Sequence, residues 1–259
     1  MIKKSGTLLG LGLGIFSIFG AFILEGGSVK ALFILSSLII VFGGTFAAVI
    51  IGFGLDKFKD VLTLIKLAYF PRQFDMVRIV DVFVELAIKA RNEGLLSIEK
   101  DLNKFGHYFP KKMVKYVMDG TDAESLYNLA QLEMKAMQER HYSNIFIFTK
   151  MGGYAPTMGI IGTVMGLIMT LANAGADPNS LIKNIATAFI ATLWGVFSAN
   201  IIWLPIGDRL KKCHLEEKNL MEISLEGVLT LQSGEIPSVM KARLLGMLPQ
   251  KVQLRKLNP

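Results

Sequence analysis

The stretch YAPTMGIIGTVMGLIMTLA, residues 154–172, decides the fold class of this chain. It is long and apolar enough to cross a bilayer as a helix. It also contains Pro156, which removes one backbone donor, and the pair Gly162-xxx-Gly166, which allows a second helix backbone to approach closely. Thr163 adds a hydroxyl near the middle of the span, where it needs a hydrogen-bond partner. This combination favours a helix that lines a pathway over a helix that only anchors the chain.

The composition of the whole chain extends this interpretation. The 259 residues are 52% hydrophobic with a mean hydropathy of +0.46, which is too apolar for an ordinary soluble domain. Four segments lack charged residues, and each is long enough to span a hydrocarbon core: 5–24, 31–55, 151–176 and 184–207. Since no strand pattern appears and no cleavage signal follows the first apolar run, we predict an all-α integral membrane protein with four retained transmembrane helices.

The distribution of basic residues predicts the orientation of the four spans. Most of the 28 Lys and Arg residues lie in segment 56–144 or after Gly207, whereas the two short connections between spans hold one each, Lys30 and Lys183. The positive-inside rule therefore places both termini and the middle segment in the cytoplasm. The net charge of +7 is explained in the same way and does not indicate a nucleic-acid partner. We divide the chain into transmembrane helices 1 and 2 (1–55), a cytoplasmic helical region (56–144), transmembrane helices 3 and 4 (145–207) and cytoplasmic C-terminal helices (208–259).

The segment 56–144 reads as a set of helices rather than a linker. Apolar residues at helical spacing over 77–87 predict a helix that ends at about Asn92, with Gly94 as its stop signal. A second helix is expected to begin near Ser97, and a short one to open at Pro110. The capping-box pattern TDAE, residues 121–124, predicts the start of a long helix that continues into the third span. In the tail, breaks are expected at Gly234 and before Pro237.

The spans lack the groups that usually carry ions. None of the four contains Asp, Glu, His or Arg, although a protein that moves protons or cations usually needs an intramembrane carboxylate. If ions cross this chain, another polypeptide must supply the carboxylate. No nucleophile–base arrangement, phosphate loop or metal-ligand cluster appears, and Cys213 is the single cysteine. We therefore expect neither an enzyme, nor a cofactor, nor a metal site.

Six residues are the candidates for function. The hydroxyls of Thr163 and Thr192 either bond back to their own helices or face one pore, where oxygen ligands would suit a hard cation such as sodium. Pro156 and Pro205, in the two glycine-rich spans, are packing kinks or working hinges, and Pro205 marks the cytoplasmic end of the fourth span. Arg91 and Glu99 either complement helix dipoles or form a docking contact, and spacing alone favours the dipoles.

The three histidines are isolated in the sequence. His107, His141 and His214 are each expected to be solvated surface residues.

Several motifs in the same order resemble the MotA/PomA family of flagellar motor stator subunits, over nearly the whole length. They are GGTFAAV (43–49), KARNEGLLSIEKDL (89–102), MDGTDAE (118–124), YAPTMGIIGTVMGLI (154–168), ATLWG (191–195), IIWLPIGDRLK (201–211) and EGVLTLQSGEIPSVMKARLLGMLP (226–249). The resemblance implies a bacterial inner-membrane protein in which five such subunits surround two copies of MotB or PomB. That partner would supply the ion-carrying aspartate and a peptidoglycan anchor, which accounts for the missing carboxylate.

The resemblance also assigns roles to the candidate residues. It implies that Arg91 and Glu99 contact the rotor protein FliG, which reverses the preference from spacing. Pro156 and Pro205 match prolines tied to ion-driven conformational change. Thr163 and Thr192 match threonines that line the cation site of sodium-driven members, and threonine rather than alanine at 163 favours sodium over protons.

Three alternatives stay open at this point. An ExbB/TolQ-like proton-channel subunit would energise outer-membrane processes, but such relatives typically have three spans. A membrane scaffold would conduct no ions, and its two threonines would only pack. A self-sufficient carrier is disfavoured by the absence of carboxylates from the spans.

Overall fold

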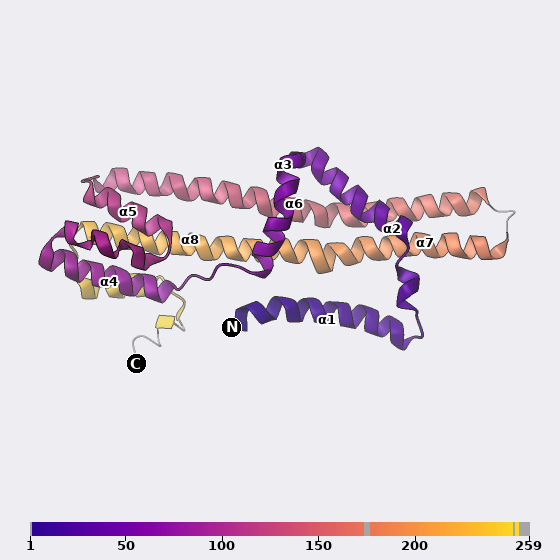
Figure 1. Cartoon of the computed structure of the whole chain (residues 1–259), viewed down its shortest axis with the longest axis horizontal. Coiled ribbons are helices and arrows are strands. Elements are labelled where there is room, and N and C mark those ends of the chain that lie inside the picture. Colours follow the sequence, from indigo (N-terminus) through magenta and orange to yellow (C-terminus); the bar gives the residue numbers. More distant parts are fainter. Residues whose placement is uncertain (1, 174–176, 251, 254–259) are drawn as a thin grey trace. The chain divides into compact units, whose positions relative to one another are not determined.

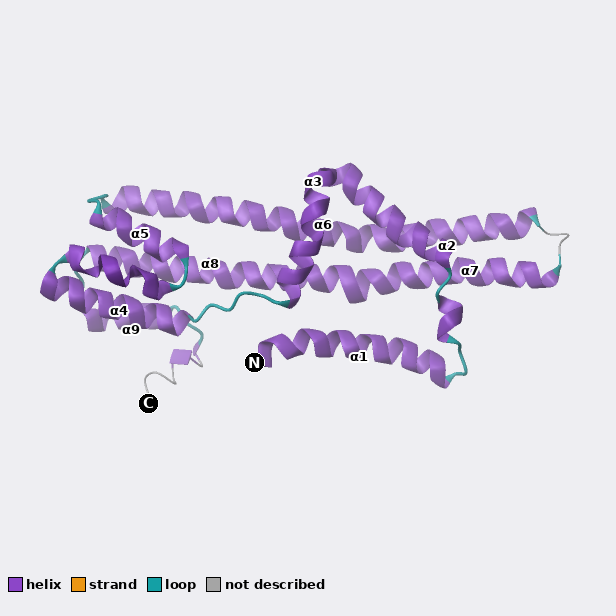
Figure 2. Ribbon diagram, in the orientation of Figure 1, coloured by secondary structure: helices purple, strands orange, loops and turns teal. Residues whose placement is uncertain are grey.

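The computed structural model describes residues 2–173, 177–250 and 252–253, and these residues form helices and loops without a strand (Figure 2). The all-α prediction is therefore confirmed. Helices are labelled as in Figure 1, and short 3-10 and π segments are here labelled η. In chain order the elements are α1 (Ile2–Leu24), η1 (Val29–Leu32), α2 (Leu35–Leu38), η2 (Ile39–Gly43), α3 (Gly44–Tyr69), α4 (Met76–Glu93), η3 (Leu95–Phe105), α5 (Tyr108–Met118), α6 (Ala123–Ala172), α7 (Pro178–Phe197), η4 (Ser198–Trp203), α8 (Leu204–Gln232) and α9 (Pro237–Gly246).

The chain divides into two compact units. The first, here called the span unit, comprises residues 1–72 and 141–213, and the second, the polar unit, comprises residues 73–140 and 214–259. Helices α6 and α8 contribute residues to both. The predicted division at residues 56, 145 and 208 concerns the membrane boundary, and it stays a prediction.

Four helical stretches of the described chain are long and apolar enough to cross a membrane, which confirms the predicted number of spans. They lie within Gly6–Leu24, Leu35–Tyr69, Ala123–Ala172 and Pro178–Gln232. The second begins later than expected, because η1 and an extended Ile34 precede α2. The third was expected to reach Ala176, but residues 174–176 lie outside the described residues.

Aromatic side chains fill much of the core of the span unit. The rings of Trp194, Phe197 and Phe19 pack together, and the buried Trp194 indole donates a hydrogen bond of 2.7 Å to the carbonyl of Leu32. Within α3, Gly54 has a φ of 82°, a conformation that favours glycine, and the helix changes direction there. The break falls one residue before Leu55, the predicted end of the second span.

The polar unit packs α4, η3, α5 and α9 with parts of α6 and α8 around one apolar core. The rings of Phe83 and Phe105 pack against each other at a tilt, with centroids 4.6 Å apart. Gly227 makes room for Phe83, because an added Cβ would lie 2.8 Å from its ring. Gly94 ends α4 with a φ of 87°, as its position in the sequence predicts. The breaks at Gly234 and before Pro237 are also confirmed, since α8 ends at Gln232 and α9 starts at Pro237.

Two local predictions in this unit are wrong in detail. The second helix begins at Leu95, two residues before the expected Ser97, and it is a 3-10 helix that ends at Phe105. A 3-10 helix rises about 2.0 Å per residue, against about 1.5 Å for an α-helix, so the segment is longer than an α-helix of the same number of residues. The long helix starts at Ala123, and the carboxylate of Asp122, not the hydroxyl of Thr121, caps it by accepting a hydrogen bond of 2.9 Å from the backbone N–H of Ser125. That helix does continue unbroken to Ala172, as predicted.

Candidate functional site

The glycines of the defining stretch bring the backbones of α6 and α7 into direct contact. A Cβ added to Gly159 would lie 2.9 Å from the carbonyl oxygen of Ala191, and one added to Gly195 would lie 2.7 Å from that of Ala155. At Gly166 the nearest atom is the Cβ of Ala188, at 2.7 Å from the added carbon. Any side chain larger than hydrogen would therefore separate the two helices at these positions, which confirms the close approach that the small residues predict.

This close approach places Thr163 and Thr192 side by side. The Thr163 hydroxyl lies 3.1 Å from the carbonyl oxygen of Gly159, one turn back in α6, and 3.1 Å from that of Ala188 in α7. It also contacts the hydroxyl of Thr192. Two hydroxyls and two carbonyls, here called the threonine cluster, thus gather between the helices. The back-bond of Thr163 to its own helix is therefore present, and the hydroxyl also reaches Ala188 and Thr192 on the neighbouring helix. The alternative that the two hydroxyls face a pore stays a prediction.

The carbonyl of Ala188 is a member of the cluster that sequence reasoning missed. An alanine has no polar side chain, so its type carries no signal of a polar role. The contact of Ala188 with Gly166 brings this part of α7 against α6, and only the folded pair of helices shows which carbonyl Thr163 reaches.

Pro156 lies one turn before the threonine cluster, inside α6. Its ring replaces the N–H that would otherwise bond to the carbonyl of Gly152, so one link of the helical hydrogen-bond ladder is missing there. Gly195 of α7 packs against this point, with its added Cβ only 3.2 Å from the Cα of Pro156. Pro156 therefore lies at the backbone contact between α6 and α7.

Pro205 is the second residue of α8, and the helical run does not end there. The π segment η4 immediately precedes α8, and α8 continues to Gln232. A π turn pairs a carbonyl with an N–H one residue further along, which is one way for a helix to accommodate a missing donor. Pro205 is solvent-exposed in the isolated chain and lies apart from the threonine cluster.

Arg91 and Glu99 lie in the polar unit, Arg91 in the last turn of α4 and Glu99 in η3. Both side chains are exposed, and neither makes a hydrogen bond or ion pair with another residue in the described ranges. Both thus remain accessible to a partner.

The neighbouring charges are paired, in contrast. Asp101 accepts hydrogen bonds from Lys89 at 2.7 Å and from Lys104 at 3.2 Å, and Lys104 also contacts Glu85 at 3.2 Å. The hydrogen bonds from Lys89 and then Lys104 hold the pKa of the Asp101 carboxyl below its usual range, and the bond from Asp101 raises the pKa of Lys104. These pairs connect η3 to α4, so they have a structural role that Arg91 and Glu99 do not share.

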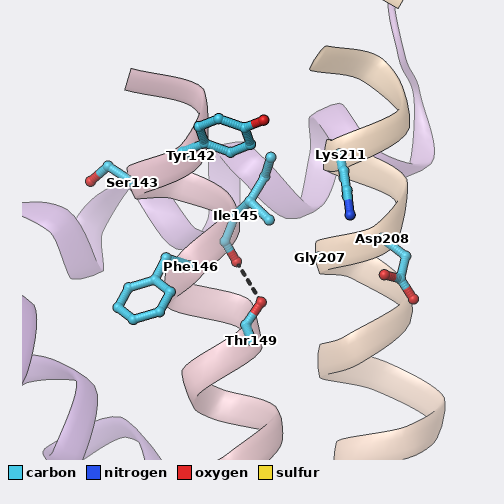
Figure 3. Close-up of a pocket in the computed structure, with 8 residues that line it drawn as sticks. All are labelled: Tyr142, Ser143, Ile145, Phe146, Thr149, Gly207, Asp208 and Lys211. Atoms are coloured by element: carbon cyan, nitrogen blue, oxygen red, sulfur yellow. Dashed lines mark hydrogen bonds between the residues drawn. The ribbon is translucent and has the colours of Figure 1, made fainter. Parts of the chain in front are cut away.

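A hollow of about 540 Å³ lies between α6 and α8 in the span unit (Figure 3). Its charged residues are Asp208 and Lys211, one turn apart on α8. The hydroxyl of Thr149 donates to the carbonyl of Ile145 at 3.3 Å and is therefore already engaged. The remaining lining residues are Tyr142, Ser143, Phe146 and Gly207.

The expectation of three solvated histidines is wrong for two of them. The His107 side chain is only 9% exposed, and its Nδ1 accepts a hydrogen bond of 3.2 Å from the N–H of Phe109 at the start of α5. His214 is 2% exposed. Both residues pack within the polar unit, a role that isolated positions in the sequence do not indicate. Within the described part of the chain, no group of three or more His, Cys, Asp or Glu residues is placed to hold a metal ion.

Comparison with known proteins yields concordant matches. The MotA/TolQ/ExbB proton channel family matches residues 101–223, and the Motility protein A N-terminal family matches residues 8–94. Motility protein A of Bacillus subtilis is 34% identical over 96% of this chain and 92% of its own length. Chemotaxis protein PomA of Vibrio alginolyticus is 30% identical over 92% of each.

Solved structures agree with these sequence matches. The flagellar MotAB stator complex from Bacillus subtilis contains a chain with a TM-score of 0.90 and 34% identity, covering 97% of this chain and 99% of its own. C. jejuni MotAB gives a TM-score of 0.88 at 26% identity, over 94% and 95%. Sequence and fold agree over almost the entire length. The chain belongs to the MotA/PomA family of flagellar motor stator subunits.

Proposed function

We propose that this chain, as a stator subunit of an ion-driven flagellar motor, forms a cation channel with a MotB- or PomB-like partner and couples inward cation flow to torque. The threonine cluster is the observation that carries the proposal. Two hydroxyls and two carbonyls offer oxygen ligands next to the glycine contact of α6 and α7. Because oxygen ligands suit a hard cation and a proton does not require them, sodium is favoured over protons as the transported ion.

The partner would supply the group that this chain lacks. No span contains a carboxylate, and the solved relatives are MotAB complexes. We infer that five copies of this chain surround two partner helices in the bacterial inner membrane, with both termini and segment 56–144 in the cytoplasm. The partner's aspartate would bind the cation, and its periplasmic domain would attach the complex to peptidoglycan.

Torque would arise when cation binding or protonation at that aspartate lets the pentamer step around the partner. Pro156 and Pro205 would serve as the hinges of this step. The position of Pro156 opposite Gly195, one turn from the threonine cluster, supports this role. Arg91 and Glu99 would then transmit the motion to FliG, and their exposure without an intrachain partner supports that assignment.

An ExbB/TolQ-like role is the second candidate, since the family match over residues 101–223 includes those proteins. The match of residues 8–94 to the Motility protein A N-terminal family favours the stator. A motile host that lacks stators separates the two, because only a stator subunit restores rotation.

The experiment that tests the proposal is a sodium titration of swimming speed. The chain and its cognate partner are expressed in a stator-less motile host, with pH and membrane potential held constant. We expect speed to rise with sodium and to saturate. Full speed without sodium would mean that the complex conducts protons rather than sodium. The absence of rotation despite correct membrane assembly would overturn the stator assignment.

A further inference from the structure

The second half of α3 is not needed to complete the second span. Gly54 interrupts the helix with a φ of 82°, and residues 35–54 before it already extend over about 30 Å, enough to cross a hydrocarbon core. The helical residues that follow, 55–69, are here called the α3 extension, which is about 22 Å long. None of the channel, hinge or rotor roles above uses it.

Contacts near both ends place the α3 extension at one level of the span unit. Just before its start, the ring of Phe53 packs against that of Phe146 in α6, with centroids 5.9 Å apart. Near its end, the carbonyl of Ala68 accepts a hydrogen bond of 3.3 Å from Nε of Arg209 in α8. Phe146 and Gly207 line the same hollow between α6 and α8 (Figure 3), so the two contacts lie at similar heights along these helices. The α3 extension therefore runs across α6 and α8 rather than along them (Figure 1).

This level is the edge of the apolar spans. Lys150 directly precedes the charge-free stretch of α6, and Asp208 directly follows that of the fourth span. Phe146 lies one turn outside Lys150, and Arg209 is the neighbour of Asp208. Because the α3 extension crosses the spans where their charges begin, it lies along the surface of the bilayer.

The side chains of the α3 extension separate into a protein face and an apolar flank. Val61, Leu64 and Ala68 are buried and pack in the core of the span unit. Leu55 and Leu62, two turns apart on one side of that face, are 55% and 77% exposed in the isolated chain. Exposed leucines on a helix at the edge of the bilayer are typical of an interfacial helix that inserts them below the headgroups.

Charged residues border this apolar flank in an ordered way. Lys59 and Lys66 each follow one of the two leucines by four residues, so they lie on the same side, further from the protein face. Both are exposed, and the ion pair of Lys59 with Asp56, at 3.3 Å, is itself open to solvent and therefore weak. Asp56 and Asp60 occupy the other side of the helix, together with Leu67. Lysines can extend from such a flank to a negatively charged surface, while the carboxylates are turned away from it.

We propose that the α3 extension is an interfacial helix that binds anionic phospholipids, in the leaflet on the side of Lys150 and Asp208. Leu55 and Leu62 insert between the acyl chains, and Lys59 and Lys66 contact the headgroup phosphates. A lipid surface fits this flank because it offers apolar chains and negative charges in the same order with depth. The inference rests on the proposed function only in that the proposed orientation makes this leaflet the cytoplasmic one.

The first test determines what covers the apolar flank. Spin labels are attached to Leu62→Cys or to Thr63→Cys, each with Cys213→Ser, in the complex with a cysteine-free cognate partner. The complex is reconstituted in vesicles of phosphatidylcholine and phosphatidylglycerol. Both positions are exposed in the isolated chain, but Thr63 points away from the apolar flank, so it is the matched control. We expect the label at position 62 to be accessible to oxygen and shielded from a water-soluble nickel complex, and the label at position 63 to show the opposite.

Two results at position 62 would overturn the inference. Access of the nickel complex would mean that the flank faces water. Exclusion of both oxygen and nickel would mean that protein, such as a second copy of this chain, covers it.

The second test concerns the charge of the lipid. Dioctanoyl-phosphatidylglycerol is titrated into the purified complex in neutral detergent, and the concentration for a half-maximal rise in melting temperature is measured. We expect this concentration to increase at least about tenfold in Lys59→Gln/Lys66→Gln, since one lysine at an anionic surface accounts for about fivefold in affinity. Lys135→Gln/Lys241→Gln removes the same charge from exposed positions of the polar unit and should change it less than about twofold.

An unchanged titration in Lys59→Gln/Lys66→Gln, or an equal response of the wild-type complex to dioctanoyl-phosphatidylcholine, would overturn the inference. The melting temperatures without added lipid verify that both double variants fold. Neither test depends on ion flux or on rotation, so a complex that conducts protons or drives no motor would give the same results.

Discussion

At the scale of single residues, the Thr163 hydroxyl makes contacts both within its own helix and with the neighbouring helix. Its contact with the Gly159 carbonyl is the ordinary back-bond of a threonine in an apolar helix. The same oxygen also reaches Ala188 and Thr192 on α7, because Gly159 leaves no side chain between the helices. Removal of the Thr163 hydroxyl would therefore remove its hydrogen-bond contacts both within α6 and with α7.

Thr163→Val keeps the shape of the side chain and removes only the hydroxyl. We expect the sodium concentration for half-maximal speed to rise by about tenfold or more, because one oxygen ligand and its hydrogen bonds are lost. Thr163→Ser retains the hydroxyl and should restore most of the response. The measurement is the sodium titration of swimming speed. An unchanged titration in the valine variant would mean that Thr163 only packs between the helices.

At the scale of elements, the pairing of α6 and α7 depends on backbone contact rather than on side-chain interdigitation. Gly159 and Gly195 face each other, with an added Cβ on Gly159 only 3.4 Å from the Cα of Gly195. Backbone atoms form both surfaces at this contact. A change of side-chain rotamer therefore cannot adjust the spacing of the two helices there. The relative position of the two helices is therefore defined where the threonine cluster and Pro156 lie.

Gly195→Ala tests this contact. The new methyl would lie 2.7 Å from the carbonyl oxygen of Ala155, so the helices must separate. We expect a destabilisation of about 1–3 kcal/mol, seen as a lower melting temperature of the purified complex, together with loss of rotation. Gly153→Ala is the control, because an added Cβ at that exposed helical glycine meets no atom within 4 Å. Equal melting temperatures for the two variants would contradict the prediction.

Pro156→Ala tests the hinge. Alanine restores the N–H that bonds to the Gly152 carbonyl, so α6 gains a hydrogen bond and becomes stiffer. We expect an unchanged or higher melting temperature and normal membrane assembly, but a swimming speed reduced by at least about tenfold. Normal speed would show that Pro156 is only a packing residue.

At the scale of the whole molecule, the four apolar spans contain no carboxylate, and a second unit of the chain is rich in charges. A complete ion carrier would need its own titratable group within the membrane. Under the proposed function, a second polypeptide would share conduction and provide anchoring, and the polar unit of this chain would make the rotor contact.

Ion flux in vesicles tests this division. We expect vesicles that contain this chain alone to show no sodium uptake above that of empty vesicles, and vesicles with the chain and its cognate partner to show uptake. Replacement of the partner's intramembrane aspartate by asparagine should remove the uptake. Uptake by the chain alone would mean that the threonine cluster conducts without a partner carboxylate.

The sequence by itself determined the helical class, the number of spans and several helix ends, including that at Gly94, because hydropathy and glycine backbone freedom act over a few residues. It also indicated Thr163, Thr192, Pro156, Pro205, Arg91 and Glu99 through their types, their positions and the family motifs.

Only the tertiary structure decided which groups meet. The contact of Thr163 with the Ala188 carbonyl, the burial of His107 and His214, and the contact of Arg209 with the Ala68 carbonyl depend on residues distant in the chain. Local patterns define helices and their faces, but the packing of those faces, and hence the environment of each polar atom, is set by long-range contacts that no short stretch of sequence encodes.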